Sequence, residues 1–196
     1  MKTDVIIVNS TDLALQDALK LAEKTAAYKE LSSKNALHLR LLTEELMSMM
    51  RSIANDMEGR FWIEDENGVY SLNLVADASM SAKKREQLIS ASTSGQNEAN
   101  RGIMGKIRSF FETDEDCPVL FNMYYTDDAG DAYQSNLCWS LDMYRDEVMR
   151  SVKENKEGAK EAWDELEKSV VSRVADDVRV SIRGREISMV IVKKMD

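Results

Sequence analysis

The sequence predicts an α/β protein with two layers, in which helices cover one face of a mixed, mostly antiparallel sheet. Three observations predict this fold class. Residues 69–76 alternate apolar and polar side chains, as a strand with one buried face does. Residues 37–53 repeat apolar side chains at three- and four-residue steps, which is the period of an amphipathic helix. A pair of alternating stretches at 178–182 and 187–191 closes the chain and adds two more strands.

The N-terminal part predicts a strand followed by two helices. Residues 5–8 are a short β-branched run, and the polar residues 9–12 after them favour a turn and a helix cap. A first helix is expected from about Asp12 to Leu31, with a break at Ser32 and Ser33. The second helix contains the range 37–53, and its apolar stripe indicates burial against another layer.

Glu44 and Ser48 lie four residues apart on another face of this second helix. Two interpretations of these polar residues stay open. Charged and polar faces of helices most often contact only water. The alternative is a functional pair, in which a carboxylate and a hydroxyl are presented together.

A β-hairpin is predicted from residues 60–64 and 69–76. The connection contains Asn67 and Gly68, and an Asn-Gly pair readily adopts the positive φ angles of a tight hairpin turn. One face of the second strand is wholly apolar, which predicts that helices pack on it.

The middle of the chain is less regular. A basic amphipathic helix is expected at 81–90, a polar loop at 91–101, and a helix after Gly102 and Gly105. We interpret 113–174 as an insertion into a single domain of residues 1–196. Within it, 137–173 predicts a hairpin of two helices broken near Gly158, and 113–136 a connection.

Composition excludes several classes of function. The net charge of -9 opposes binding to nucleic acid or to an anionic membrane surface. One histidine and two separated cysteines exclude a zinc cluster and a Ser/His catalytic triad. No stretch is long and apolar enough to span a bilayer, and the first residues lack the pattern of a secretory leader. We therefore expect a cytoplasmic protein.

The order of these elements resembles the GHKL family of ATP-binding domains, also called histidine kinase-like or Bergerat ATPases. The shared features are a polar second helix, an acidic residue at the end of a strand, a polar segment and a pair of glycines opening a helix. The nearest likeness is to the bacterial anti-sigma factor serine kinases. The resemblance covers residues 1–112 and 175–196 and implies a bound ATP with Mg²⁺.

The resemblance also implies roles for individual residues. Glu44 matches the glutamate of the second helix that acts as the catalytic base, and Ser48 stands where the family has a Mg²⁺-binding Asn. Asp77 matches the acceptor of the adenine amino group, with Ser79 and Ser81 at positions where the family has glycines. The remaining nucleotide-binding candidates belong to the lid and the phosphate cradle at a helix start: Asn97, Gly102, Gly105 and Lys106.

Two hypotheses follow. In the first, the chain is a bacterial regulatory protein that binds ATP and acts as a protein serine kinase or ATPase. Its partner would be a protein such as a sigma factor or an anti-anti-sigma-like protein. In the second, the chain is a degenerate GHKL-fold module without catalysis that acts through protein–protein binding. A homodimer is compatible with both hypotheses, and neither requires nucleic acid or a membrane.

Overall fold

The computed structural model describes residues 1–53, 58–77, 137–156, 158–183 and 186–195. The described residues form an open sheet of six strands, and every strand pairs antiparallel with its neighbours. The strand order is β1-β2-β3-β6-β5-β4. The strands are β1 (Ile6–Val8), β2 (Gly59–Glu66), β3 (Val69–Asp77), β4 (Leu137–Ser140), β5 (Asp177–Arg183) and β6 (Glu186–Lys194).

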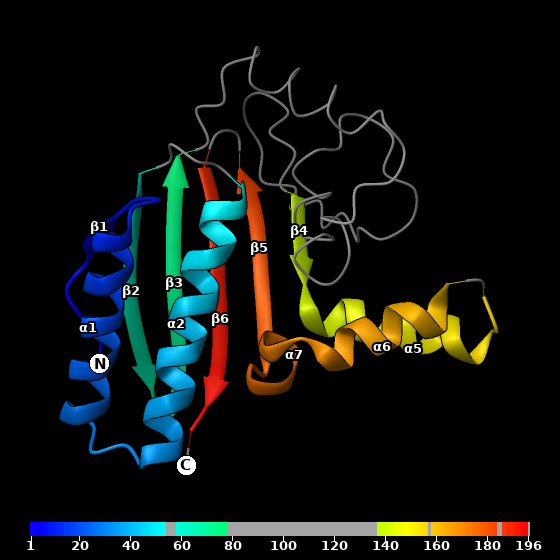
Figure 1. Ribbon diagram of the computed structural model, residues 1–196, viewed down its shortest axis with the longest axis horizontal. Helices are drawn as coiled ribbons and strands as arrows, with labels where there is room; N and C mark the ends of the chain where they lie inside the picture. The colour runs from blue at the N-terminus through cyan, green and yellow to red at the C-terminus, as the bar shows by residue number, and fades with distance from the viewer. Residues whose placement is uncertain (54–57, 78–136, 157, 184–185, 196) are drawn as a thin grey trace, which may run out of the picture.

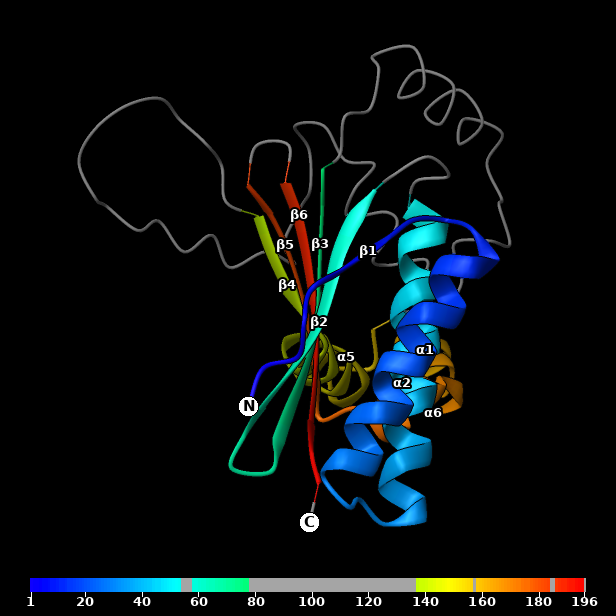
Figure 2. The same cartoon turned by 90° about the vertical axis from the view of Figure 1, so that its left-hand side faces the viewer.

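The two N-terminal helices form a layer on one face of this sheet (Figures 1 and 2). The helices are α1 (Asp12–Tyr28), α2 (Ser33–Ile53), α5 (Leu141–Lys153), α6 (Ala159–Lys168) and α7 (Val170–Val174). The α5–α6 pair extends sideways beyond β4 (Figure 1), while α7 contacts α2. None of the described helices is both long enough and apolar enough to cross a membrane.

The core lies between α1, α2 and the sheet. The apolar stripe of α2 is fully buried, with no exposure at Leu39, Leu42, Leu46, Met49 or Met50. Against it stand the alternating residues of β3, of which Leu72 and Leu74 are fully buried. The inner side of α1 is built mainly from alanines, whose small side chains let this helix approach α2 closely. Burial of these apolar faces is the main force that holds the two layers together.

Several predictions from the sequence are confirmed. The first hairpin has Asn67 at φ 54° and Gly68 at φ 83°, the positive values that its Asn-Gly turn predicted. The closing hairpin pairs β5 with β6, and its turn residues lie outside the described part. The break between α5 and α6 contains Gly158, which adopts a left-handed conformation at φ 74°.

The prediction for residues 137–173 was wrong in two respects. Its first four residues form strand β4, which pairs with β5 and so continues the main sheet. The helical part contains a third helix, α7, which begins at a new cap where the Ser169 hydroxyl accepts a hydrogen bond from the Ser172 N–H. The helices and loops predicted for 81–111 and 113–136 lie outside the described residues.

Candidate functional site

One end of the sheet gathers the ends of several elements, and we call it the Asp77 end. Here β3 ends at Asp77, β5 ends at Arg183 and β6 begins at Glu186, and α2 runs toward the same end (Figure 1). The opposite end, with the β2–β3 turn, is called the Gly68 end. Backbone groups at the ends of strands and helices are not all used in regular hydrogen bonding. Loops that follow such ends often carry the functional site of an α/β fold.

Glu44 and Ser48 lie in the C-terminal half of α2, and both are exposed. They project from the side of the helix that faces away from the sheet, because the buried stripe of α2 occupies the opposite side. No ion pair joins Glu44 to another described residue. The spacing from Glu44 to the end of α2 at Ile53 is about 13 Å along the helix axis. The structure thus places Glu44 and Ser48 together on the outer surface of α2, with both side chains exposed to solvent.

Glu45, which the sequence did not single out, lies in a different environment from Glu44. Its side chain is only partly exposed, and burial together with the neighbouring Glu44 charge raises the pKa of the Glu45 carboxyl. His38 is seven positions earlier and therefore on the same side of the helix. Burial and the charges of Lys34 and Lys193 lower the pKa of His38.

Glu44 and Glu45 lie on different sides of α2. Arg40 and Arg51 form ion pairs with Glu23 and Asp12 of α1, so they define the side of α2 that faces α1. Glu45 and His38 lie on the other side. Both pKa shifts favour the neutral form of the side chain, and burial is the largest cause of each. This side of α2 is therefore partly shielded from water, and an ionised group there lowers the stability of the fold. The local signal in the sequence was two adjacent glutamates, but spacing alone could not tell which one is sheltered.

The backbone around Asp77 is ordered by strand pairing. Asp77 pairs with Glu186 in register, and Gly59 pairs with Ala76. A β-carbon at Gly59 would lie 3.2 Å from the Val75 carbonyl oxygen and 3.3 Å from the Ala76 β-carbon, so this position has little room for a side chain. The Arg60 guanidinium lies 3.6 Å from the Glu186 carboxylate on the same edge. Strand pairing therefore holds the backbone at the Asp77 end of the sheet in a fixed position.

The other candidates for nucleotide binding, Ser79, Asn97, Gly102, Gly105 and Lys106, lie outside the described residues. Among the described residues, no group of three or more His, Cys, Asp or Glu side chains could hold a metal ion. Any Mg²⁺ bound here by Ser48 would need most of its ligands from water or from a bound phosphate, which is a common arrangement for this ion. Comparison with protein-family models, curated proteins and solved structures gave no match to this chain.

Proposed function

We propose that this chain is a bacterial regulatory protein with a nucleotide site of the GHKL type at the Asp77 end of the sheet. The observation that supports the proposal is that β3 ends at Asp77 and that α2, which bears Glu44 and Ser48 on its outer side, runs toward the same end of the sheet (Figure 1). The order strand, two helices, hairpin and closing hairpin agrees with the resemblance to the anti-sigma factor serine kinases.

In this proposal each residue has one chemical task. The Asp77 carboxylate accepts a hydrogen bond from the amino group of adenine. Glu44 takes the proton of the attacking hydroxyl, which belongs to a serine of the partner protein or to water. The Ser48 hydroxyl supplies one oxygen to Mg²⁺, directly or through water. Bound Mg-ATP would supply the phosphoryl group and charge neutralisation. The remaining contacts come from Ser79, Asn97, Gly102, Gly105 and Lys106, as the resemblance implies.

The access to Glu44 supports its role, because a general base must reach the proton that it removes. Glu44 is exposed on α2 and forms no ion pair with another described residue, so its carboxylate is free to approach a substrate. The sheltered position of Glu45, one residue away, offers a second carboxyl whose raised pKa brings it closer to the pH at which proton transfer is efficient.

The second candidate function is a module that binds a protein without catalysis. Three serines, Ser48, Ser79 and Ser81, replace residues that the GHKL resemblance requires for metal and base binding. The α5–α6 pair extends beyond the edge of the sheet, and Met149 and Val152 on α5 are exposed by 41% and 37%. Exposed apolar side chains on a projecting helix are suited to contact with a partner protein.

Isothermal titration of the full chain with Mg-ATP distinguishes these two functions. We expect saturable heat for the unchanged protein, loss of that heat in Asp77→Asn, and retention of it in Asp164→Asn. Asp164 is an exposed residue of α6 and serves as the matched control. Absence of heat at millimolar nucleotide, with a folded protein by circular dichroism, removes the nucleotide proposal and leaves the binding module.

Glu44→Gln tests the catalytic step separately. The substitution keeps the shape of the side chain but removes its ability to take a proton. We expect nucleotide affinity to change little and the rate of phosphate release or transfer to fall by about a hundredfold or more. An unchanged rate would show that Glu44 is not the base, and Glu45→Gln would then be the variant to measure.

A further inference from the structure

His38 is the one histidine of this chain, and it lies in the N-terminal half of α2. Its Nδ1 atom is buried and has no hydrogen-bond partner among the described residues. The Arg51 Nε is the other described side-chain nitrogen in this condition. A different nitrogen of that guanidinium donates to the Thr11 carbonyl oxygen and to the Asp12 carboxylate, so Arg51 is still firmly bound.

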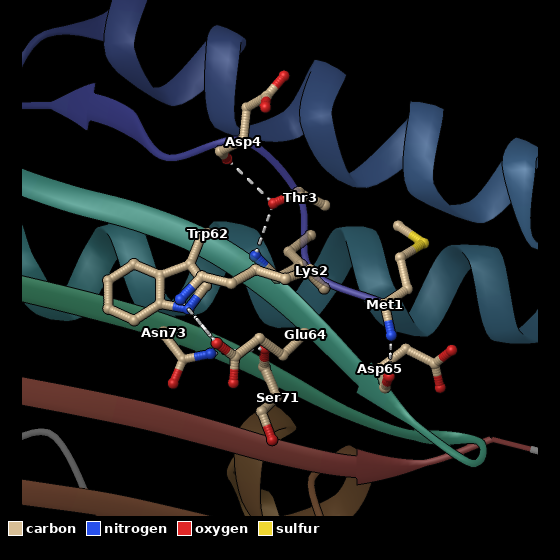
Figure 3. Close-up of polar contacts among 10 residues, drawn as sticks. Met1, Lys2, Thr3, Asp4, Trp62, Glu64, Asp65, Ser71 and Asn73 are labelled. Atoms are coloured by element: carbon tan, nitrogen blue, oxygen red, sulfur yellow. Dashed lines mark hydrogen bonds and ion pairs between the residues drawn. The ribbon is translucent and has the colours of Figure 1, made fainter.

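Other sheltered polar groups of the sheet do have partners (Figure 3). The Asn73 amide donates to the Ser71 carbonyl oxygen, and the Trp62 indole N–H donates to the Glu64 carboxylate. A neutral imidazole can present Nδ1 as a lone pair without a hydrogen, whereas an imidazolium carries a hydrogen on both ring nitrogens. A buried N–H of a charged group without an acceptor is costly. The surroundings of Nδ1 therefore suit the neutral ring.

Two ammonium groups act on the His38 ring, one from each layer. Lys34 lies four positions earlier on α2 and so on the same side of the helix. Lys193 belongs to β6, which contacts α2, and it stands in register with the buried Tyr70, so its side chain is on the helix side of the sheet. Burial and the charges of Lys34 and Lys193 lower the pKa of His38.

The carboxylate beside Lys193 is already engaged. Asp176 accepts a hydrogen bond of 2.8 Å from the Lys193 ammonium and one of 2.6 Å from the Lys194 N–H. The charge of Arg145 also acts on this carboxyl group. Asp176 therefore neutralises cations that are present at every physiological pH, and it is not available to a newly formed imidazolium.

The remaining elements that contact α2 offer His38 no free carboxylate among the described residues. Helix α7 contributes Arg173, which is a further cation. Helix α1 contributes Glu23 and Asp12, and each forms an ion pair with an arginine on the opposite side of α2. Glu45 lies seven positions after His38 on the same side of α2, about 10 Å along the helix axis. Burial raises the pKa of Glu45, so this carboxyl also favours its neutral form.

We propose that His38 makes the packing of α2 on β6 sensitive to acid. At neutral pH the ring is uncharged, and the N-terminal half of α2 lies against the Lys193 end of β6. When the ring takes up a proton, the imidazolium repels both ammonium groups and brings a buried N–H that has no acceptor. The N-terminal half of α2 then separates from β6 more often, whereas the side of α2 that is paired with α1 keeps its contacts.

The direction of the pH dependence follows from linkage. A histidine with a lowered pKa in the folded state leaves stability unaffected above its ordinary value of 6.5. As pH falls below that value, the open form binds the proton more readily than the closed form, and the contact weakens. Asp65 and Asp176 remain ionised in this range, because the pKa of each is below its ordinary value of 3.8.

An NMR titration of the ring signals measures His38 directly, since no other histidine contributes. We expect a midpoint below 6.5, and a higher midpoint in Lys34→Gln and in Lys193→Gln, because each substitution removes a repelling charge. Lys160→Gln, at an exposed lysine of α6, is the matched control and should leave the midpoint unchanged. A midpoint at or above 6.5, or an equal response to all three substitutions, would overturn the proposal.

Hydrogen exchange of the full chain tests the loosening itself. Rates at about pH 7 and about pH 5.5 are compared after correction for the intrinsic effect of pH on amide exchange. We expect protection of residues 34–42 to fall by about threefold or more at the lower pH, and protection of α1 to stay constant. His38→Gln has no titrating ring and should abolish the fall. The fall should persist in Glu45→Gln, which excludes that carboxyl group as its source.

Two results of the exchange experiment would overturn the proposal. A fall in protection that persists in His38→Gln would assign the acid response to another group. An equal fall in α1 and α2 would show that the whole fold is destabilised, without a local opening at β6. Neither the NMR titration nor the exchange experiment uses nucleotide, so this proposal and the nucleotide proposal fail independently.

Discussion

The two ends of the sheet differ in what their polar groups contact. At the Gly68 end, Asp65 is 6% exposed, and its carboxylate contacts both the Lys29 ammonium at 2.5 Å and the Gly68 N–H at 3.0 Å. The Met195 N–H donates to the Gly68 carbonyl oxygen at 2.8 Å, which ties the end of the chain to the hairpin turn. The polar groups of this end are used in holding α1, the hairpin and β6 together.

Toward the Asp77 end, carboxyl groups of α2 remain without such contacts. Glu44 is exposed, and Glu45 is partly buried without an ion pair to another described residue. Polar groups that are not used in holding the fold together are available for a ligand, although their burial or mutual repulsion lowers stability. The comparison predicts that substitutions at the Gly68 end destabilise the protein, whereas substitutions at α2 change ligand binding with little loss of stability.

The largest effect is expected for Gly68→Ala. Gly68 has φ 83°, which an L-residue adopts only with strain, and an added β-carbon would lie 3.0 Å from the Met195 carbonyl oxygen. We expect the free energy of unfolding to fall by about 2 kcal/mol, as the sum of backbone strain and the close contact. Urea denaturation of the purified variant measures this change.

Gly158→Ala is the matched control for that strain. Gly158 has a similar φ of 74°, but nothing lies within 4 Å of the added β-carbon. Its cost should therefore contain only the backbone part, about 1 kcal/mol. If both substitutions lower the free energy of unfolding by the same amount, the contact with Met195 contributes nothing to the cost of Gly68→Ala.

A smaller effect is expected for Asp65→Asn, and it should depend on pH. The Lys29 ammonium and the Gly68 N–H hold the pKa of Asp65 below its ordinary value of 3.8. An acid with a lowered pKa stabilises the fold fully above its ordinary value and loses this contribution as pH falls through the folded-state pKa. The melting temperature of the unchanged protein should exceed that of Asp65→Asn at pH 7, and the difference should narrow below about pH 4.

Asp65 does not act alone in that pH range. Burial by itself would raise the pKa of Asp176, but hydrogen bonds from the Lys193 ammonium and the Lys194 N–H together with the charges of Lys193 and Arg145 lower it overall. Asp176 is present in both the unchanged protein and Asp65→Asn. The difference between their melting temperatures at each pH therefore excludes the contribution of Asp176. A difference in melting temperature that stays constant down to pH 2.5 would contradict the ion pair with Lys29 as the source of the effect.

The sequence predicted the parts of the fold that have a local period. The stripe of α2 and the alternation of β3 appear within a few turns or residues, and burial then selects the same face that the pattern indicates. The Asn67-Gly68 turn was predictable for a similar reason, because two adjacent residues set its φ angles. Helix α7 and strand β4 were not, since β4 is four residues long and becomes a strand only by pairing with β5.

The candidate site was less predictable because it depends on how helices lie beside one another. Adjacent glutamates on a helix point about 100° apart. The ion pairs of Arg40 and Arg51 with α1 lie on one side of α2 and Glu45 lies on the other, and the spacing of the residues alone does not show which side is buried. The strand order of the sheet was also not predictable from local patterns. Strand β3 pairs with β6, and the residues that pair lie more than a hundred positions apart in the chain.

The smallest effect is expected for Glu45→Gln, and its sign is opposite to the others. Burial and the Glu44 charge raise the pKa of Glu45 above its ordinary value of 4.5, so the ionised carboxyl destabilises the fold at neutral pH. Removing this charge should stabilise the protein at pH 7 by a few tenths of a kcal/mol, because the side chain is still partly exposed to water. Below pH 4.5 the carboxyl is protonated in both the folded and the unfolded state, and the gain should disappear.

Glu44→Gln, at the exposed neighbour, is the control and should change stability less. A loss of stability in Glu45→Gln at pH 7 would mean that the ionised Glu45 carboxyl is held by a favourable contact. In that case α2 would be as firmly tied as the Gly68 end, and the contrast between the two ends would not hold.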